Sequence, residues 1–386
     1  MIETLSTLDR PPGSPGERRA AELLAERLAV QGAAVTVECE WVHGTYWVPL
    51  GIGSSLGAAA GLLPRLPAVA LAATAAASIA DDLEIGARPL RRVLRQRTIS
   101  NVVAEFAPAS ADRTLVVHAH HDAAHTGIVF HPGGAKLATR IGGRLMDRLG
   151  TQPVPLAGAV LGPAAVALGA LTGRRRVRAL GALSAAGHAA AMADIAHSPA
   201  VPGANDNLSG VSVLVSLADR IAARPTERLR VILLSTGSEE SFLEAMVRFG
   251  ERHFARLDRA TTTFLCLESV GSPELMLLDG EGLLRLHRYP KALIDRLTRL
   301  AVERGIPLRD PFRYRLATDG QVPLRAGYPT AVITSMDWYH APSNYHWPTD
   351  RPENLDRQTV ARAAELAEAL LRDLDAAPAS HPAAAA

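Results

Sequence analysis

The chain has 386 residues, a formal net charge of +2 and two cysteines. This length allows a large buried core, in one α/β domain or in two smaller ones. The small net charge, with no basic stripe interleaved with aromatic side chains, excludes nucleic acid as the expected partner. Cys39 and Cys266 are too far apart in sequence to suggest the disulfide framework of a small secreted domain, and no cleavable export signal is evident. We therefore expect a cytoplasmic location.

The first predicted element is an amphipathic helix over residues 17–31, where Ala21, Leu24 and Leu28 share one face and Gly32 follows as a stop. Further along, β-branched or continuously apolar runs predict strands, and apolar periodicity predicts helices between and after them. The expected strands are 33–41, 99–106, 114–120, 228–236 and 261–269, and the expected helices are 207–223, 241–256, 289–305 and 356–374.

Strands that alternate with helices predict an α/β fold with a mostly parallel central sheet covered by helices on both faces. We expect one such domain over residues 1–386, interrupted by inserts. The C-terminal residues 376–386 are rich in Ala and Pro without an apolar face. They are expected to form a flexible tail.

Two stretches break the alternation and are predicted to be inserted apolar helical hairpins. The first occupies residues 44–82 and is uncharged except at Arg65 before it reaches Asp81. The second lies within residues 123–200, where uncharged runs flank an arginine cluster at 174–178. This second insert separates the candidate residues at 120 and 206, so we expect it to lie near the active site, either roofing the cleft or delivering a lipophilic substrate.

The sequence does not decide whether the hairpins contact a membrane or a second subunit. The leading run of each hairpin reaches the roughly 20 residues that a spanning helix needs, whereas the trailing runs are shorter. With a cytosolic catalytic part, the four arginines of the second tip would face outward, against the positive-inside tendency. Packing of the hairpins within the protein or in a homodimer is the alternative.

Candidate catalytic side chains follow the ends of the predicted strands. His120 and Asp122 lie two residues apart after the strand at 114–120, so both point to one face, and the carboxylate can orient the imidazole toward a metal. Glu239 and Glu240 follow the strand at 228–236, where open α/β sheets place their ligand crevice. Taken alone, each pair has an ordinary structural explanation. His120 and Asp122 could be a surface or core pair, and Glu239 and Glu240 could stabilise the start of a helix.

Three further side chains complete the set. Asp206 lies in the polar loop PGANDNLSG, where turn formation and helix capping are the ordinary explanations. Glu268 ends another apolar strand, which packing alone does not explain. His346 lies in a loop before the last helix. No single motif is decisive, but five separate elements each end in a histidine or a carboxylate.

The order His-x-Asp, Asp-Asn, Glu-Glu, Glu, Tyr-His resembles the co-catalytic zinc aminopeptidase family, which includes bacterial leucyl aminopeptidases, glutamate carboxypeptidase and glutaminyl cyclases. The resemblance covers most of the chain outside the two inserts. The stretches PPGSPGERRAAELLAERLAVQG, SNVVAEF and TDGQVPLRAGYPTAVI support it.

This resemblance implies a metallopeptidase with two zinc ions per chain, acting on a peptide or amide substrate. It makes Asp206 the carboxylate that bridges both ions, with His120 and Glu268 completing one site and Glu240 and His346 the other. Glu239 is implied as the general base. Asp122 joins it in the catalytic set as the partner of His120. Mixed nitrogen and oxygen ligands of this kind suit zinc, although they also accept manganese or cobalt.

Two departures from the family pattern bear on substrate selection. Glu268 stands where the aminopeptidases of the family usually have Asp, and residues 241–246 read SFLEAM instead of a Gly-Leu-x-Gly-Ser stretch. Hydrolysis of a terminal peptide bond by an aminopeptidase-type enzyme is the leading expectation. Glutaminyl cyclisation, carboxypeptidase or deacylase activity, and a non-enzymatic membrane or scaffold protein are the alternatives.

The remaining nearby histidines have other expected roles. His118 is assigned to the core and His121 points to the opposite face from His120. His125 and His131 are candidates for the mouth of the cleft. His340 is the runner-up to His346 as the last ligand.

Overall fold

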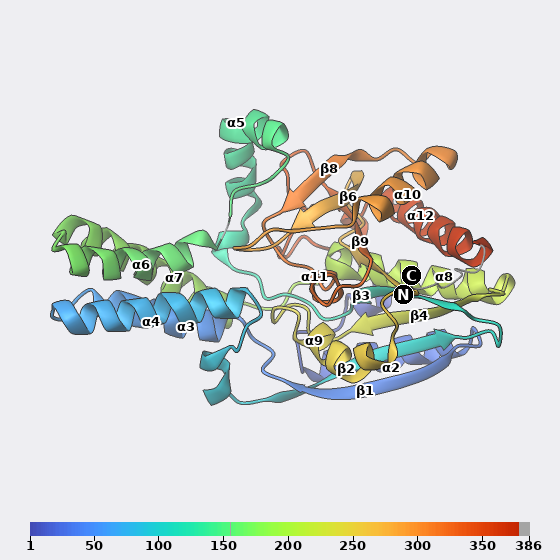
Figure 1. The fold of residues 1–386 in the computed structure, drawn as a ribbon, viewed down its shortest axis with the longest axis horizontal. Helices are drawn as coiled ribbons and strands as arrows, with labels where there is room; N and C mark the ends of the chain where they lie inside the picture. The colour runs from blue at the N-terminus through green and yellow to red at the C-terminus, as the bar shows by residue number, and fades with distance from the viewer. Residues whose placement is uncertain (155, 378–386) are drawn as a thin grey trace, which may run out of the picture.

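The computed structural model describes residues 1–154 and 156–377. A nine-stranded sheet runs through its body in the order β1-β2-β4-β3-β5-β9-β6-β7, and β8 pairs with β6 (Figure 1). The strands are β1 Ala34–Val42, β2 Arg97–Phe106, β3 Arg113–His120, β4 Leu229–Thr236, β5 Thr262–Glu268, β6 Glu274–Glu281, β7 His287–Arg288, β8 Arg309–Tyr314 and β9 Thr330–Met336.

The centre of the sheet is parallel. Strands β4, β3, β5 and β9 are parallel neighbours, whereas β1, β2 and β6 pair antiparallel with their neighbours on this path. The predicted α/β class with a mostly parallel central sheet is therefore confirmed. Because parallel strands end at the same edge, the carboxyl ends of β4, β3 and β5 lie together.

Helices cover both faces of the sheet, as predicted. Alternate residues of one strand belong to different cores: Val116 packs in the cluster with Met246 and Phe249 of α9, whereas Val117 packs in the cluster with α2, α8, α10 and α12. The helices are α1 Ile2–Leu5, α2 Pro15–Ala29, α3 Trp47–Ala60, α4 Arg65–Leu83, α5 Pro132–Leu149, α6 Ala157–Thr172, α7 Arg175–His197, α8 Gly210–Ala223, α9 Glu244–His253, α10 Lys291–Glu303, α11 Gln321–Arg325 and α12 Arg357–Ala376.

Two predicted helix starts differ from the structure for identifiable reasons. Helix α2 begins two residues earlier than predicted because Ser14 accepts a hydrogen bond from the Glu17 N–H and Pro15 fits the first helical position. Helix α9 begins at Glu244 and not at residue 241, because Phe242 and Leu243 adopt left-handed φ values of 65° and 62°.

The two predicted apolar hairpins are present and pack against each other. Helices α3 and α4 form one hairpin and α6 and α7 the other, and all four make a bundle that projects from the body (Figure 1). The insert at 123–200 holds more than a hairpin, because it also contains the amphipathic helix α5 at the base of the bundle, which was not predicted. The boundaries 44–82 and 123–200 remain predictions.

Two helices of the bundle, α4 and α7, are long and apolar enough to cross a membrane by length and composition, and α6 is a shorter apolar helix. At the other end of the chain, α12 extends to Ala376. Most of the predicted tail, residues 378–386, lies outside the described residues.

Candidate metal centre

The predicted donor residues converge at the carboxyl edge of the parallel strands. His120 is the last residue of β3 and Glu268 the last residue of β5, and Glu240 follows β4 by four residues. Asp206 lies in the turn η3 (Ala204–Ser209) that leads into α8. His346 comes from the loop after β9. Parallel strand order thus brings together side chains that are more than 200 residues apart in sequence.

One half of the site joins His120, Asp206 and Glu268. The His120 Nε2 atom lies 3.2 Å from Asp206 Oδ1 and 3.5 Å from Glu268 Oε1. The longer side chain of Glu268, where the family usually has Asp, is held in place because Ser269 Oγ donates a hydrogen bond to its Oε1 and the Asn207 amide lies 3.5 Å from its Oε2. The extra methylene is therefore accommodated within this half of the site.

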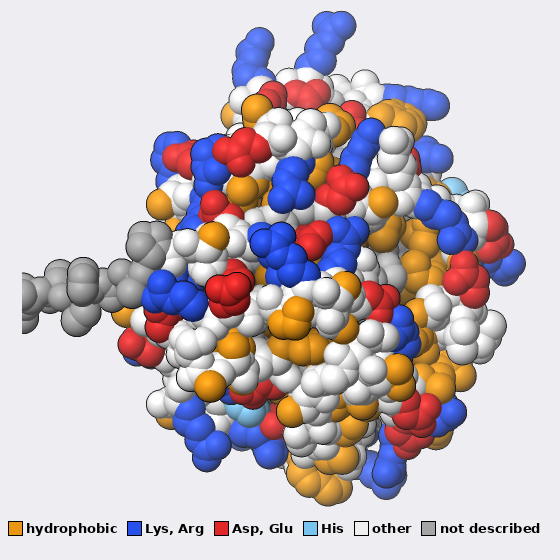
Figure 2. All heavy atoms as spheres, turned by 90° about the vertical axis from the view of Figure 1, so that its right-hand side faces the viewer, with side chains coloured by type: hydrophobic (Ala, Val, Ile, Leu, Met, Phe, Trp, Pro, Cys, Tyr) orange, Lys and Arg blue, Asp and Glu red, His pale blue; other side chains and the backbone are white. Residues whose placement is uncertain are grey.

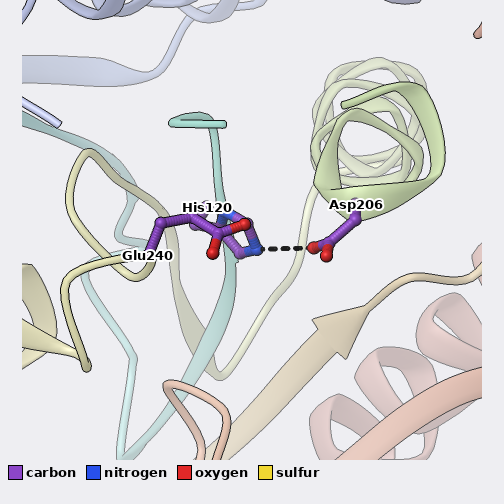
Figure 3. A group of neighbouring side chains, drawn as sticks. All are labelled: His120, Asp206 and Glu240. Atoms are coloured by element: carbon purple, nitrogen blue, oxygen red, sulfur yellow. Dashed lines mark hydrogen bonds and ion pairs between the residues drawn. The ribbon is translucent and has the colours of Figure 1, made fainter. Parts of the chain in front are cut away.

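The other half joins His346, Asp206 and Glu240. The His346 Nε2 atom lies 3.2 Å from Asp206 Oδ2 and 3.3 Å from Glu240 Oε2. The two oxygens of Asp206 thus face different imidazoles. Figure 3 shows the central part of the arrangement: His120, Asp206 and Glu240 converge from a strand end, a helix entrance and a loop, with donor atoms within 4.8 Å of one another.

This donor set fits divalent metal ions. Asp206, Glu240 and Glu268 are all buried, and within the described part of the chain they form ion pairs with His120 and His346 alone. Buried carboxylates need compensating positive charge. Buried Glu240 Oε1 and His346 Nδ1 have no hydrogen-bond partner among the described residues. Each half offers one imidazole nitrogen and two carboxylates, which are ligand types that zinc accepts.

In the metal-free chain, nearby carboxylates raise the pKa of both imidazoles. Burial alone would lower the pKa of His346, but Glu240 and Asp206 outweigh it and raise the pKa to about 10. The pKa of His120 is likewise raised well above its usual value, because Glu268, Asp122 and Asp206 outweigh the effect of burial. Both rings therefore carry a proton at neutral pH until a metal displaces it.

Zinc binding to the metal-free chain at pH 7 should release protons. An imidazole must be neutral to bind a metal, and the raised folded pKa values of His120 and His346 keep both rings protonated at that pH. Apparent zinc affinity should accordingly fall as the pH is lowered. Isothermal titration in buffers of different ionisation enthalpy measures the release. A value of zero, or uptake of protons, would contradict this assignment.

Asp122 links the first imidazole to the paired glutamates. Its carboxylate is fully buried, with Oδ1 3.3 Å from His120 Nδ1. The same carboxylate accepts hydrogen bonds from the backbone N–H groups of Glu239 at 3.2 Å and Glu240 at 3.0 Å. Asp122 therefore acts as a positioning residue that sets the orientation of His120 and the place of both glutamates together.

An Asp122→Ala variant should bind zinc about 10- to 100-fold more weakly, since residues that orient a metal-bound histidine have effects of that size. The loss arises because His120 and the Glu239–Glu240 turn lose their common anchor. Competition with a chelator measures the affinity. Asp122→Asn, which keeps one acceptor oxygen, should recover part of it. Unchanged affinity in Asp122→Ala would show that the carboxylate has no positioning role.

Several residues that support the site were not predicted from the sequence. Asp350 accepts hydrogen bonds from the backbone N–H groups of Asn205 at 2.7 Å and Asp206 at 3.1 Å. The Asn207 side-chain oxygen accepts from Ser269 N–H at 3.0 Å. These groups act on backbone atoms, so spacing in the sequence gives little sign of them. The only signal was the position of Asp350 shortly after His346.

The remaining histidines are sorted by their contacts. His118 is fully buried and lies edge-on to Phe264, and burial lowers its pKa to about 3, which agrees with a core role. His121 contacts Ser235 Oγ at 2.9 Å and Glu17 at 3.2 Å, away from the donor set.

The runner-up ligand His340 lies 2.7 Å from Asp147 and not among the donors, so the geometry favours His346. His131 lines the cavity described next, as anticipated for the cleft mouth. His125 does not: its Nδ1 lies 2.6 Å from the Ser198 carbonyl oxygen and its ring lies against Trp47.

A cavity of about 700 Å³ opens onto the donor set. Glu239, Glu240 and His346 form its polar end. Glu239 is half-buried, and burial together with Glu240 and Glu268 holds its pKa well above the usual value despite nearby His120. The rest of the wall is mostly apolar and comes largely from α5, α7 and the loops near them. The altered SFLEAM stretch contributes Phe242, which stacks on Tyr46 with ring centroids 4.6 Å apart.

Comparison with known proteins agrees with this geometry. Residues 183–371 match the model of Peptidase family M28. This part of the chain, just under half of its length, is therefore similar to M28 peptidases. The M28 match includes Asp206, Glu240, Glu268 and His346, whereas His120 lies upstream of it. No curated protein matches the chain.

Solved structures share the fold at low identity. A zinc-dependent exopeptidase from Parabacteroides distasonis has 13% identity and a TM-score of 0.58, over 97% of this chain and 96% of that one. An aminopeptidase from Aneurinibacillus sp. strain AM-1 has 14% identity and a TM-score of 0.55, over 97% and 92%. A glutaminyl cyclase from Tannerella forsythia has 15% identity and a TM-score of 0.55, over 98% and 96%. These likenesses establish the fold alone.

Together with the M28 match, they confirm the predicted resemblance to the co-catalytic zinc aminopeptidases. The chain is a zinc hydrolase of the metallopeptidase class, as predicted. The number of zinc ions and the bond that is cleaved are separate questions.

Proposed function

We propose that the chain is an aminopeptidase-type exopeptidase with two zinc ions, which hydrolyses the bond after the first residue of a peptide. The observation that carries the proposal is the division of Asp206 between two imidazoles, at 3.2 Å on each side. His120, Glu268 and Asp206 Oδ1 would hold one ion. His346, Glu240 and Asp206 Oδ2 would hold the other.

Bound zinc would supply Lewis-acid polarisation of the scissile carbonyl and a water of lowered pKa. Glu239 lies at the polar end of the cavity next to the donor set, with its backbone fixed by Asp122. Its carboxylate would accept a proton from the attacking water and donate it to the leaving amine. Asp122 would keep His120 and the Glu239–Glu240 turn in fixed positions relative to each other during both proton transfers.

The charges of the cavity favour recognition of a free amino end. Among the described residues of its wall, the acidic side chains are Glu239 and Glu240, and there is no lysine or arginine. A terminal carboxylate would find no lysine or arginine there, whereas a terminal ammonium group can pair with a carboxylate. The apolar remainder of the wall suits a large apolar first side chain.

One set of matched peptides tests end specificity. A Leu- or Phe-initiated peptide should be cleaved with its carboxyl end free or amidated, and acetylation of its amino end should abolish turnover. Turnover that survives acetylation but requires a free carboxyl end would instead assign a carboxypeptidase.

Glutaminyl cyclisation is the second candidate, because the cyclases share this fold. Cyclisation also uses a free amino end but involves one zinc ion and no attack by water. Zinc analysis together with assays on a leucyl anilide and a glutaminyl peptide separates the two. Two zinc ions per chain with anilide hydrolysis supports the peptidase. One ion with release of a pyroglutamyl peptide supports the cyclase.

A further inference from the structure

The bundle of α3, α4, α6 and α7 has an unusual distribution of side chains. Large apolar side chains such as Leu50, Ile79 and Met192 pack its interior near the body, whereas further out the buried cluster consists of Ala60, Ala72 and Val166. Several of its leucines point outward and are more than half exposed: Leu62, Leu66, Leu161, Leu168, Leu171, Leu180 and Leu183. In a bundle that is surrounded by water, large apolar side chains are expected inside. Small residues at helix contacts with leucine outside are typical of helices in lipid.

Close helix contacts confirm that small residues are required in the interior. A Cβ atom on Gly57 would lie 2.5 Å from Pro163 Cγ, and a Cβ on Gly181 would lie 2.7 Å from backbone atoms of α6. The helices therefore approach each other nearly backbone to backbone. The outer leucines lie away from these contacts, with more than half of each residue exposed.

Charged residues lie at the two ends of the bundle, and the stretch between them is uncharged. The far end carries Arg65 and the arginines at 174–178, and the near end carries Asp81, Asp82 and Asp194. Residues 66–80 of α4 and 179–193 of α7 are uncharged between these ends. Fifteen helical residues measure about 22 Å, and arginine side chains can snorkel outward to reach headgroups across a core of about 30 Å.

Helix α5 carries a second exposed apolar surface beside the bundle. Leu137, Ile141, Leu145 and Leu149 recur every four residues and are 58%, 80%, 57% and 51% exposed. Lys136, Arg140, Arg144 and Arg148 recur with the same spacing, one position earlier. This is the pattern of a helix that lies in the headgroup layer of an anionic membrane. Helix α5 stands at the base of the bundle, across the direction in which the bundle projects (Figure 1).

The opposite end of the molecule has a different surface. Figure 2 shows the face turned away from the bundle, where basic and acidic side chains intermingle.

We propose that the bundle inserts into a lipid bilayer while α5 lies in its anionic headgroup layer, so that the enzyme works at a membrane surface. The active-site cavity fits this placement, because Ser184, His188 and Met192 of α7 and Ala138 of α5 line it.

Cytoplasmic flanks of membrane helices usually carry more lysine and arginine than the opposite flanks. A cytoplasmic body is compatible with this tendency when the basic residues at the base of the bundle are counted. Nine basic residues flank the bundle helices on the body side, against five at the tip. Those on the body side are Arg88, Arg91, Arg92, Arg95, Arg97, Lys136, Arg140, Arg144 and Arg148, and those at the tip are Arg65, Arg174, Arg175, Arg176 and Arg178.

Site-specific fluorescence on the full chain tests the insertion. In a Cys39→Ser background, where the remaining Cys266 is buried, an environment-sensitive dye is attached to a cysteine placed at Leu180, at Ile141 or at the control Val302. Val302 is 76% exposed on α10. With vesicles of phosphatidylcholine and phosphatidylglycerol, lipids brominated deep in the chain should quench the dye at 180. Shallow bromines should quench the dye at 141, and neither should quench it at 302.

Charge reversal tests the role of α5 separately. Arg140→Glu and Arg144→Glu should each weaken binding to the anionic vesicles by about fivefold or more, with Arg304→Glu on the far side as the matched control. A chain that stays monodisperse without detergent and shows no quenching at either position overturns the proposal. Cross-linking between two copies through a cysteine at 180, without quenching, would instead assign the bundle face to a homodimer. Both readouts are independent of catalytic activity.

Discussion

Replacing Glu239 with Gln should lower turnover on every accepted substrate by about 10²- to 10⁴-fold, which is the range that a positioned general base contributes. The amide has nearly the shape of the carboxylate but cannot take up the proton of the attacking water. Glu239 lies on the cavity wall, and none of the described residues forms a hydrogen bond with its side chain. Folding should therefore be unaffected, and zinc content should equal that of the parent.

Steady-state rates on a leucyl anilide, with zinc measured on the same samples, check this prediction. Glu274→Gln, which changes an exposed glutamate at the start of β6, is the matched control and should keep full activity. If Glu239→Gln retains both zinc and turnover, another group must be the base.

Replacing Asp206 with Asn should have an even larger effect, because one carboxylate serves both halves of the site. An asparagine side chain offers one oxygen and no charge, so it cannot face His120 and His346 in the way that Asp206 does. Bound zinc should fall from two ions to at most one per chain. Turnover should fall by at least about 10³-fold, since several kcal/mol of metal-ion stabilisation are lost.

The matched control is Glu281→Gln, at a buried carboxylate outside the donor set. Burial raises the pKa of Glu281 to about 8, so glutamine resembles its form at neutral pH. This variant should keep two zinc ions. An Asp206→Asn protein that also kept two ions would show that the carboxylate does not bridge them.

The sequence was most informative where a histidine or a carboxylate lay at the end of a recognisable strand. His120 and Glu268 follow apolar runs that could be identified as strands, and parallel strand order then brings their ends together. Asp206 and His346 lie in loops and had no such signal of their own. Their inclusion depended on the order of the whole set, and the structure places both of them at the site.

Other parts of the architecture had weaker local signals. Strands β6 and β8 lie beyond the parallel centre, and β8 includes Asp310 and Pro311 in a mixed pattern that does not indicate a strand. Strand β9 is buried throughout and had a usable apolar signal, yet it was not predicted. The amphipathic helix α5 was overlooked because its surroundings are uncharged, which made the whole insert resemble a hairpin.

The assembly of the two hairpins into one bundle could not be predicted, since contacts between α3 and α7 join segments more than 100 residues apart. The same holds for groups that act through the backbone. Asp350 fixes the turn at Asn205 and Asp206 from a loop near the end of the chain. Such contacts depend on tertiary placement, which periodicity and motif spacing do not describe.

Sharing of Asp206 by two zinc ions can be observed by anomalous scattering, measured on both sides of the zinc absorption edge, from crystals of the zinc-loaded chain. Two peaks are expected, one beside Asp206 Oδ1 with His120 and Glu268 and one beside Oδ2 with His346 and Glu240. A single peak, or peaks away from Asp206, would show that this carboxylate does not bridge two zinc ions.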